Sequence, residues 1–222
     1  MKTTAIIVAA GSGSRFNSDT PKQFLEIHGK TVIDHTIERF VAAPSVDEII
    51  LVLAADRIDS YGRSRVPKLT SVVAGGSTRA ESVANGIAAV ADETELIAVH
   101  DGARPLVSID EVERTIAAAK VSGAACLVAQ VTDTIKLIQG SEVMATLDRL
   151  KLRRALTPQV FKKDLLLKAF EGVTLDESTT DECYLVERLG HSITVVEGSS
   201  RNFKITHRED LILAEALMRK DV

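Results

Sequence analysis

The chain opens with the stretch Thr4-Ala5-Ile6-Ile7-Val8-Ala9-Ala10-Gly11-Ser12-Gly13-Ser14-Arg15, and Pro21-Lys22-Gln23-Phe24 follows shortly after it. The apolar part predicts a buried strand. The glycines after it predict a loop whose backbone N–H groups can approach phosphate oxygens closely. Arg15 and Lys22 add positive charge where a triphosphate would lie. This stretch therefore predicts a phosphate-binding loop in a protein that handles a nucleotide.

Two common glycine-loop patterns do not fit this spacing. A dinucleotide-binding fingerprint needs a third glycine at the position that Phe16 occupies, and a P-loop needs Gly-Lys-Ser/Thr where Phe16-Asn17-Ser18 stands. The connection from Gly11 to the next helix is also longer than the few residues usual between a strand and a helix. We therefore expect a functional loop of another nucleotide-binding class.

Composition limits the class of protein further. The 222 residues carry a net charge of −4 with 4% aromatic residues and no Trp, so we expect neither a nucleic-acid partner nor a membrane. Cys126 and Cys183 have no metal-ligand spacing, and the five histidines form no ligand cluster. Neither a signal peptide nor a membrane-spanning apolar run is evident, which favours a reducing, cytoplasmic location. One domain spanning residues 1–222 suits this length.

Short Val/Ile/Leu runs alternate with segments of helical period, which predicts an α/β fold with a doubly wound, parallel sheet. Strands are expected at Ala5–Ala9, Glu48–Leu53, Thr70–Val73, Leu96–Val99 and Ala125–Val131. Helices are expected at Thr31–Ala42, Arg79–Val90, Asp110–Ala119 and, introduced by Thr206, at Arg208–Met218. Ligands of such sheets bind beyond the carboxyl ends of the strands. The loops 11–22, 75–79 and 101–105 should therefore meet in one crevice.

The pattern changes after Val131. Residues 132–138 alternate polar with apolar, residues 139–141 are turn-like, and residues 142–147 resume an extended pattern, so we expect a β-hairpin arm. An isolated hairpin is marginally stable in water. Its apolar side chains should therefore pack against a partner subunit or the parent sheet; they are Ile135, Leu137, Val143 and Leu147.

Seven sequence blocks together resemble one family. They are Ala9-Ala10-Gly11-Ser12-Gly13-Ser14-Arg15, Pro21-Lys22-Gln23-Phe24, Gly75-Gly76-Ser77-Thr78-Arg79-Ala80-Glu81-Ser82-Val83, His100-Asp101-Gly102-Ala103-Arg104-Pro105, Asp133-Thr134-Ile135-Lys136, Leu156-Thr157-Pro158-Gln159 and Asn202-Phe203-Lys204-Ile205-Thr206. In this order they resemble the 2-C-methyl-D-erythritol 4-phosphate cytidylyltransferases of the non-mevalonate isoprenoid pathway, from residue 4 to about residue 218. The resemblance implies a Rossmann-like nucleotidyltransferase fold, with a mostly parallel sheet. It also implies a homodimer in which the arm, residues 131–154, interlocks two subunits.

The resemblance implies that the phosphate of methylerythritol phosphate attacks the α-phosphorus of CTP, which releases pyrophosphate, with Mg²⁺ as the divalent cation. A phosphate monoester has a second pKa near 6, so the acceptor is already an anionic nucleophile and needs no general base. The protein must instead hold two polyanions in line and stabilise the charge on the transferring phosphorus. Guanidinium, ammonium and metal cations suit that task.

Site residues follow from the resemblance position by position. It makes Arg15 and Lys22 the catalytic cations at the α-phosphate. The implied CTP site consists of Ala10, Gly11, Gly13, Gly76, Ser77, Arg79 and Ser82, although Ser77 stands where some members have an acidic residue. The implied acceptor site, for a polyol phosphate, consists of Asp101, Arg104, Thr134, Arg149, Thr180 and Lys204. Asp101 is also the implied Mg²⁺ ligand, and Arg149 and Lys204 would position the attacking phosphate.

Alternatives remain in the same and in other classes. Ribitol- and ribulose-5-phosphate cytidylyltransferases share most of these blocks and differ in the acceptor pocket. A nicotinamide-dependent oxidoreductase or a non-catalytic nucleotide-binding regulator could use the same fold class. The missing third glycine argues against the oxidoreductase. The loop cations Arg15 and Lys22, together with Arg149 and Lys204, argue against the regulator.

Overall fold

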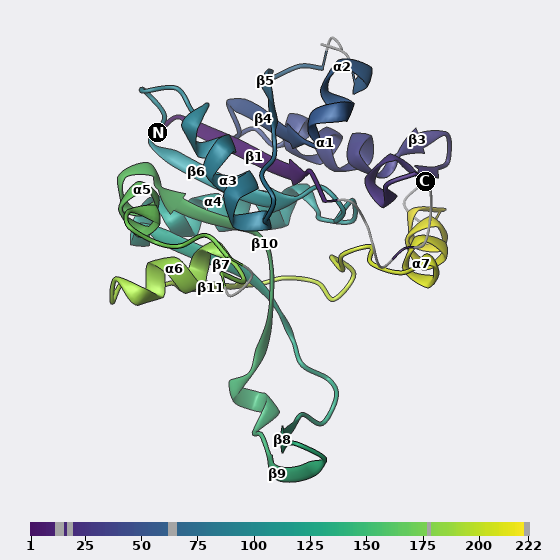
Figure 1. Ribbon diagram of the computed structural model, residues 1–222, viewed down its shortest axis with the longest axis vertical. Helices are drawn as coiled ribbons and strands as arrows, with labels where there is room; N and C mark the ends of the chain where they lie inside the picture. The colour runs from purple at the N-terminus through teal and green to yellow at the C-terminus, as the bar shows by residue number, and fades with distance from the viewer. Residues whose placement is uncertain (12–15, 17–19, 62–65, 177–178, 220–222) are drawn as a thin grey trace.

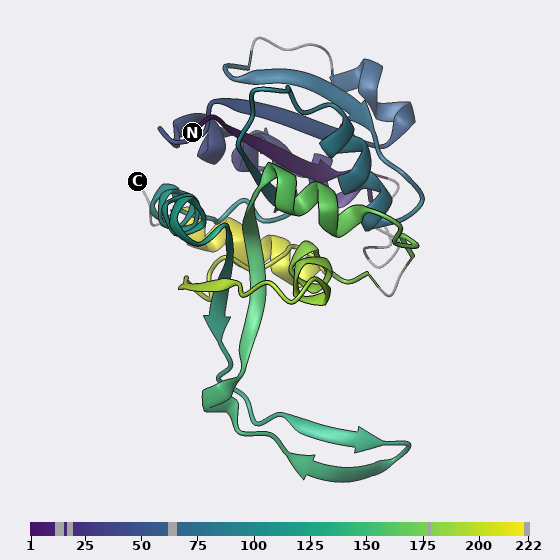
Figure 2. The same cartoon turned by 90° about the vertical axis from the view of Figure 1, so that its left-hand side faces the viewer.

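The computed structural model describes residues 1–11, 16, 20–61, 66–176 and 179–219. Its centre is a seven-stranded sheet (Figures 1 and 2). In sheet order the strands are β11 (Thr194–Glu197), β7 (Ala124–Gln130), β10 (Arg153–Lys162), β6 (Leu96–Asp101), β1 (Thr3–Ala9), β4 (Glu48–Leu53) and β5 (Leu69–Ala74). All neighbouring pairs run parallel except the two that β10 makes, with β6 and with β7. The predicted mostly parallel, doubly wound sheet is confirmed.

Helices cover both faces of this sheet. On one face lie α1 (Val32–Ala42) and α4 (Ile109–Ser122), and on the other lie α3 (Arg79–Ala88), α5 (Lys163–Phe170) and α6 (Glu182–Arg188). The residues of β1 from Ala5 to Ala9 are all apolar because both faces of the strand are covered. Ile7 packs in the core with α1, and Ile6 packs in the core with α3. Each is fully buried, which contributes about 1.5–3 kcal/mol per side chain.

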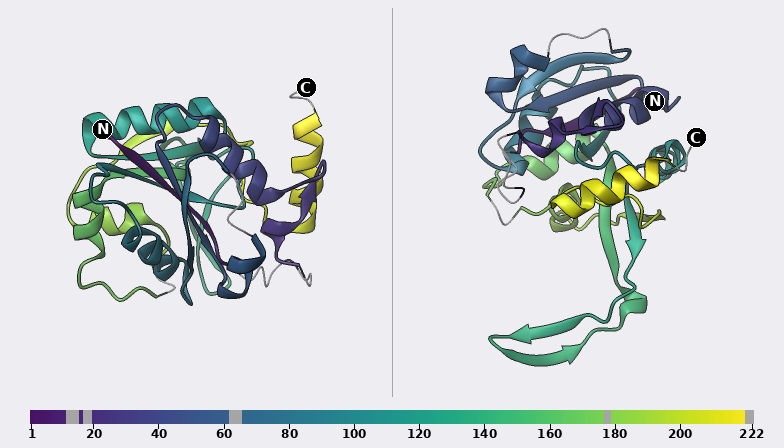
Figure 3. Two further views of the ribbon diagram at one scale, coloured as in Figure 1. Left: turned by 90° about the horizontal axis from the view of Figure 1, so that it is seen from above. Right: turned by 90° about the vertical axis from the view of Figure 1, so that its right-hand side faces the viewer.

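A third, smaller core lies beside the sheet (Figure 3). It joins α7 (Arg208–Met218) to the two-stranded hairpin of β2 (Glu26–Ile27) and β3 (Lys30–Thr31), which follows the short 3₁₀ helix η2 (Lys22–Phe24). Ile205 is fully buried in this core, and its N–H donates to the Ala103 carbonyl at 2.8 Å. Its neighbour Lys204 is thereby held beside the loop that follows β6. The helical turns η3 (Ala55–Arg57) and α2 (Ile58–Tyr61) complete this half of the chain.

Helix starts follow the expected capping chemistry with one correction. The Ser108 hydroxyl accepts from the Glu111 N–H at 3.1 Å, and the Glu111 carboxylate accepts from the Ser108 N–H at 2.8 Å, so the predicted cap of α4 is confirmed. The prediction that Thr206 introduces α7 is wrong by one residue, because the N-cap is His207. Among the described residues, no helix combines the length and the apolar composition that crossing a membrane requires.

The sequence did not indicate strand β10, although this strand lies inside the sheet, between β7 and β6. Pro158 interrupts its apolar pattern and has no N–H for the strand ladder. The register between β10 and β7 shifts between Ala155 and Gln159, around this proline. Helices α5 and α6 and strand β11 were likewise not predicted. β10 matters for the site because it places Thr157 next to the end of β6.

The predicted hairpin is present and projects away from the sheet (Figures 1 and 2). It consists of β8 (Lys136–Gln139), a turn at 140–141 with Gly140 at φ +58°, β9 (Glu142–Thr146) and the 3₁₀ helix η4 (Arg149–Lys151). All residues of β8 and β9 are exposed, and the side chains of Leu137 and Val143 are 51% and 61% exposed. These two side chains do not pack against the parent sheet, so that alternative is wrong for them. A partner subunit remains the predicted cover.

Candidate active site

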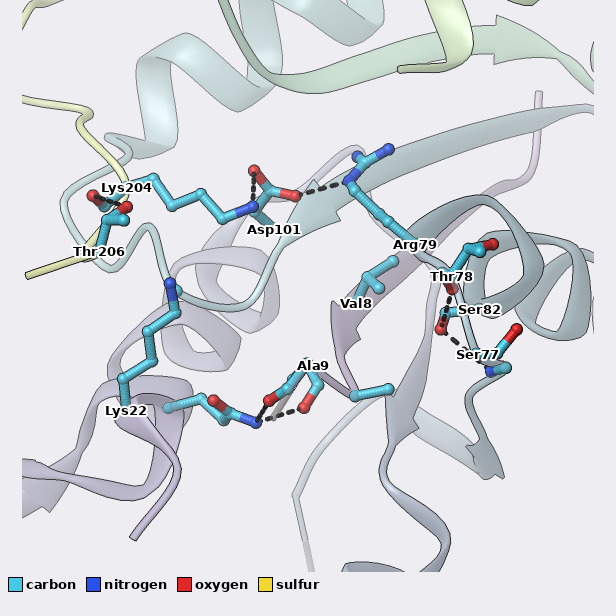
Figure 4. Close-up of a pocket in the computed structure, with 15 residues that line it drawn as sticks. Val8, Ala9, Lys22, Ser77, Thr78, Arg79, Ser82, Asp101, Lys204 and Thr206 are labelled. Carbon is cyan, nitrogen blue, oxygen red and sulfur yellow. Dashed lines mark hydrogen bonds and ion pairs between the residues drawn. The ribbon is translucent and has the colours of Figure 1, made fainter. Parts of the chain in front are cut away.

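A cavity of about 440 Å³ lies at the carboxyl ends of β1, β5 and β6 (Figure 4). Its walls come from the loop after β1, the loop after β5 and the loop after β6, with η2 and the 204–206 segment closing the remaining side. The three loops expected to share a crevice therefore do meet. Among the described residues, nine predicted site residues line the cavity: Ala10, Gly11, Lys22, Gly76, Ser77, Arg79, Ser82, Asp101 and Lys204.

Among the described residues, the other predicted site residues do not line this cavity. Arg15 and Gly13 fall outside the described residues. Arg104 lies behind the cavity wall, where its Nη1 donates to the Asn202 carbonyl at 2.9 Å. Thr134 and Arg149 belong to the arm, where Arg149 Nη1 donates to the Thr132 carbonyl at 2.6 Å, and Thr180 is exposed just before α6. Their predicted contacts with the acceptor stay predictions.

Gln23 holds the phosphate-loop end of β1 in place, and the sequence analysis missed it. Its Nε2 donates to the Ala9 carbonyl at 2.7 Å and to the Gly11 carbonyl at 3.0 Å, and the residue is 3% exposed. One buried amide thus fixes the end of β1 to η2, the element that carries Lys22. The signal in the sequence was a polar residue between Lys22 and Phe24, but its backbone partners have no sequence signature.

Glycine at position 75 lets the loop after β5 approach the loop after β1, and glycine at position 76 lets that same loop approach the first turn of α3. A Cβ at Gly75 would lie 2.2 Å from the Cβ of Ala10, and a Cβ at Gly76 would lie 2.3 Å from the Cβ of Glu81. A side chain at either position would clash with these atoms and displace the backbone. The close approach of Gly75 to Ala10 therefore sets the width of the cavity at its predicted nucleotide end.

Ser77 and Ser82 are held by hydrogen bonds at the start of α3. Ser82 Oγ donates to the Thr78 carbonyl at 2.9 Å and accepts from the Gly76 N–H at 3.1 Å. Glu81 accepts at one carboxylate oxygen from the Ser77 hydroxyl at 2.5 Å and from the Ser77 N–H at 2.6 Å. These bonds from Ser77 lower the pKa of the Glu81 carboxyl. Because the Ser77 hydroxyl proton points to Glu81, its oxygen faces other partners as an acceptor.

Asp101, the last residue of β6, lies at the centre of a charge cluster. Its Oδ1 is 3.0 Å from Arg79 Nε, and its Oδ2 is 3.0 Å from Arg104 Nε and 3.3 Å from Lys204 Nζ. Burial raises the pKa of the Asp101 carboxyl, but Arg79, Lys204 and Arg104 outweigh burial and hold that pKa well below its ordinary value. Asp101 is therefore ionised at neutral pH and fixes Lys204 at the cavity (Figure 4).

His100 orders the turn that follows Asp101. Burial lowers the pKa of His100 to about 3, so the ring is neutral at physiological pH. Thr157 Oγ1 accepts from the Asp101 N–H at 3.1 Å, which leaves its proton for His100 Nδ1 at 3.0 Å. The ring proton is then on Nε2, which donates to the Arg104 carbonyl at 3.2 Å. Both ring nitrogens are thus used in structure, and His100 is no candidate for a general base.

This buried histidine predicts a loss of stability in mild acid. The unfolded state binds a proton at His100 below about pH 6.5, whereas the folded state does so only near its own pKa of about 3. Its contribution to stability is complete above pH 6.5 and falls as the pH is lowered towards 3. Between pH 7 and pH 5 the free energy of unfolding should decrease by about 2 kcal/mol from this group.

Urea unfolding followed by circular dichroism at pH 5 and pH 7, in EDTA, measures this difference. His100→Gln should be less stable at pH 7 but should lose most of the pH dependence. His191→Gln, at a partly exposed histidine, is the matched control and should keep the wild-type dependence. An unchanged pH dependence in His100→Gln would show that other groups cause the acid sensitivity.

Comparison of the sequence with known proteins identifies its family. The sequence pattern of the 2-C-methyl-D-erythritol 4-phosphate cytidylyltransferase family matches residues 3–220. The chain belongs to this family. It is 39% identical over 225 residues to the 2-C-methyl-D-erythritol 4-phosphate cytidylyltransferase of Alkaliphilus oremlandii, with 98% of this chain and 95% of the relative covered. The corresponding protein of Endomicrobium trichonymphae is 41% identical over 220 residues, with 99% and 100% covered.

Solved structures of family members have the same fold. The 4-diphosphocytidyl-2C-methyl-D-erythritol synthase of Anaerococcus prevotii superposes with a TM-score of 0.86 at 32% identity, with 98% of each chain covered. The 2-C-methyl-D-erythritol 4-phosphate cytidylyltransferase of Thermus thermophilus superposes with a TM-score of 0.78 at 35% identity, covering 99% of this chain and 100% of that one. The resemblance of the seven blocks and the predicted family are therefore confirmed.

Proposed function

We propose that this protein transfers the cytidylyl group of CTP to 2-C-methyl-D-erythritol 4-phosphate, forming 4-diphosphocytidyl-2-C-methyl-D-erythritol and pyrophosphate. The proposal includes a homodimer acting in the cytoplasm. One observation carries it: in a member of this family, the cavity places Lys22 and Lys204 opposite a wall of glycine and small polar residues. Such a cavity suits two phosphate-bearing ligands, one of them a nucleotide.

In this mechanism the protein contributes charge and position. The acceptor phosphate is already an anion at neutral pH, so the reaction needs no general base. Lys22 stabilises the negative charge that develops on the α-phosphate, together with the predicted cation Arg15. Lys204, held by Asp101, positions the attacking phosphate, and the predicted role of Arg149 is the same. Two cations that face the reacting phosphates lower the repulsion between the two polyanions.

Mg²⁺ belongs to this proposal, and Asp101 is its proposed ligand from the protein. Among the described residues no group of three or more His, Cys, Asp or Glu side chains could form a metal cage. Mg²⁺ bound to nucleotides usually takes one or two carboxylates and completes its shell with phosphates and water, so one carboxylate fits. The two carboxylate oxygens of Asp101 offer roughly four lone-pair positions. Asp101 makes one ion pair at Oδ1 and two at Oδ2, so Oδ1 retains room for a bond to the metal ion. When bound, the ion would neutralise phosphate charge.

The nucleotide end of the cavity predicts selectivity for CTP over purine nucleotides. Gly76, Ser77 and Ser82 leave space for one ring, and the Ser77 oxygen can accept from an exocyclic amine. The value of kcat/KM for CTP should exceed that for ATP or GTP by about 100-fold or more. Pyrophosphate release with each nucleotide at a fixed acceptor concentration measures the ratio. Comparable turnover of ATP would rule out this base site.

The identity of the acceptor tests the function as a whole. Pyrophosphate release with CTP should be fastest with 2-C-methyl-D-erythritol 4-phosphate and much slower with ribitol 5-phosphate or ribulose 5-phosphate. A preference for either pentose phosphate would assign the protein to that acceptor instead. Thermal shift distinguishes the remaining classes, because CTP with Mg²⁺ should raise the melting temperature and NAD should not. CTP binding without turnover of any of these acceptors would favour a non-catalytic nucleotide-binding protein.

A further inference from the structure

A chain of ion pairs extends from the cavity into the protein interior. Arg79 Nε lies 3.0 Å from Asp101 Oδ1, while Arg79 Nη1 and Nη2 lie 2.7 Å and 3.1 Å from the two carboxylate oxygens of Glu182. The three residues come from the end of β6, the first turn of α3 and the first turn of α6. Glu182 is 1% exposed and is not among the residues that line the cavity. Nothing in the sequence patterns pointed to it.

The guanidinium group of Arg79 bonds both carboxylates, so the orientation of Asp101 depends on the position of Glu182. Its N–H groups are fixed in one plane, and a bidentate pair sets the orientation of that plane. With Nη1 and Nη2 bound to Glu182, Nε must face Asp101 Oδ1. Asp101 Oδ2 then faces Arg104 and Lys204. The orientation of the carboxylate that holds Lys204 at the cavity therefore depends on a residue outside the cavity.

Stability alone does not account for this arrangement. A buried ion pair is often no more stabilising than apolar residues of similar volume, because both charges lose their hydration. Three cations contact Asp101, and one of them, Arg79, also makes the bidentate pair with Glu182 that fixes the plane of its guanidinium group. Without the bidentate pair to Glu182, the plane of the guanidinium group would no longer be fixed, and Arg79 could turn from Asp101 towards the cavity, where a phosphate would compete for it.

We propose that Glu182 is a positioning residue of this site: it holds Arg79 on Asp101 and thereby fixes Asp101 and Lys204 for the acceptor. The inference deepens the proposed function and rests on it for its kinetic consequences. It also separates two roles of Arg79. Because Arg79 lines the cavity, its own substitution would affect a direct nucleotide contact as well, whereas Glu182 acts only through Arg79.

The test compares Glu182→Gln with Glu111→Gln. Glutamine keeps the shape of Glu182 but loses its charge and one acceptor oxygen. Glu111 is a matched control, since it is 3% exposed and its carboxylate accepts from the Ser199 and Ser108 N–H groups away from the cavity. Both variants should be less stable to urea. The kcat per folded molecule should fall about tenfold or more in Glu182→Gln and should stay at the wild-type value in Glu111→Gln.

Conservative variants and a crystal structure complete the test. Glu182→Asp, which keeps the charge, should retain more activity than Glu182→Gln. Arg79→Lys, which keeps the charge but loses the planar bidentate pair with Glu182, should lower kcat, and adding Glu182→Gln to it should cost little more. In crystals of Glu182→Gln, Arg79 should no longer bond Asp101.

Two failures are distinguishable. If the wild type turns over no acceptor with CTP, the proposed function fails, and the crystal structure of Glu182→Gln still decides whether Glu182 positions Arg79. The inference itself is overturned if Glu182→Gln keeps the Arg79–Asp101 bond, or if its kcat per folded molecule equals that of Glu111→Gln. A loss of stability in both variants with equal kcat would leave Glu182 a purely structural residue.

Discussion

Lys22→Ala should lower kcat by at least about 100-fold, which corresponds to about 3 kcal/mol of transition-state stabilisation. Lys22 lines the cavity from η2, and its side chain points into the space between the two walls (Figure 4). Its charge matters most as negative charge develops on the transferring phosphorus. The effect should therefore appear in kcat more than in the KM for either substrate. Initial rates of pyrophosphate release at saturating CTP and acceptor measure it.

The fold should survive this substitution, because the Gln23 amide holds η2 to the end of β1 and remains in place. Circular dichroism and the urea midpoint of Lys22→Ala should be close to those of the wild type. Lys168→Ala, at an exposed lysine of α5, is the matched control and should keep full activity. Arg15→Ala should behave as Lys22→Ala does. Near-normal turnover in either variant would show that the residue concerned is not a catalytic cation.

The sequence predicted the strands that are apolar throughout, because a strand covered on both faces needs an uninterrupted apolar run. β4 has the predicted bounds, and β1, β5, β6 and β7 differ by a few residues at their ends. β10 could not be predicted in the same way, since Pro158 breaks its pattern and the surrounding strands supply its place in the sheet. The loops that end β1, β5 and β6 were predictable because parallel strands present their carboxyl ends at one edge.

The parts of the site that sequence analysis missed depend on tertiary contacts. Gln23 bonds to backbone carbonyls, and Glu182 pairs with an arginine 103 positions away, so neither contact has a local pattern. Cys126 and Cys183 give a further example. They are far apart in the sequence, yet both belong to one buried core in which α6 packs with β7, and there hydrogen bonding to Cys126 and burial raise the pKa of the Cys183 thiol. Periodicity identifies the buried face of an element but not its partner.

Removal of the arm should produce a monomer that loses acceptor turnover. Leu137, Ile138, Val143 and Met144 are between 51% and 64% exposed, and this apolar surface is the proposed contact with a second subunit. Deleting residues 131–147 should therefore shift the protein from dimer to monomer in sedimentation analysis. CTP should still raise the melting temperature of the deletion variant, because the residues that line the nucleotide end of the cavity remain. A dimer that forms without the arm would contradict this role.

The sharpest test of the arm mixes two inactive variants. Arg149 lies on the exposed arm and does not line the cavity of its own chain, so its predicted contact with the acceptor requires delivery to the partner subunit. Lys22→Ala and Arg149→Ala should each be nearly inactive. After subunit exchange at equal amounts, half of the dimers are mixed, and one site in each mixed dimer combines an intact Lys22 with an intact Arg149 from its partner. About a quarter of the wild-type activity should return.

The recovered fraction shows whether Arg149 acts in the partner's site or in the site of its own subunit. If Arg149 served its own subunit, every site in a mixed dimer would lack one of the two residues, and exchange would restore nothing. Exchange must be confirmed independently, by following a tagged subunit into mixed dimers, and a mixture of Lys22→Ala with Arg15→Ala provides the control. Both residues are predicted to act in the site of their own subunit, so that mixture should stay inactive. Recovery in the first mixture alone would therefore place Arg149 in the partner's site, whereas no recovery after confirmed exchange would make the two sites independent.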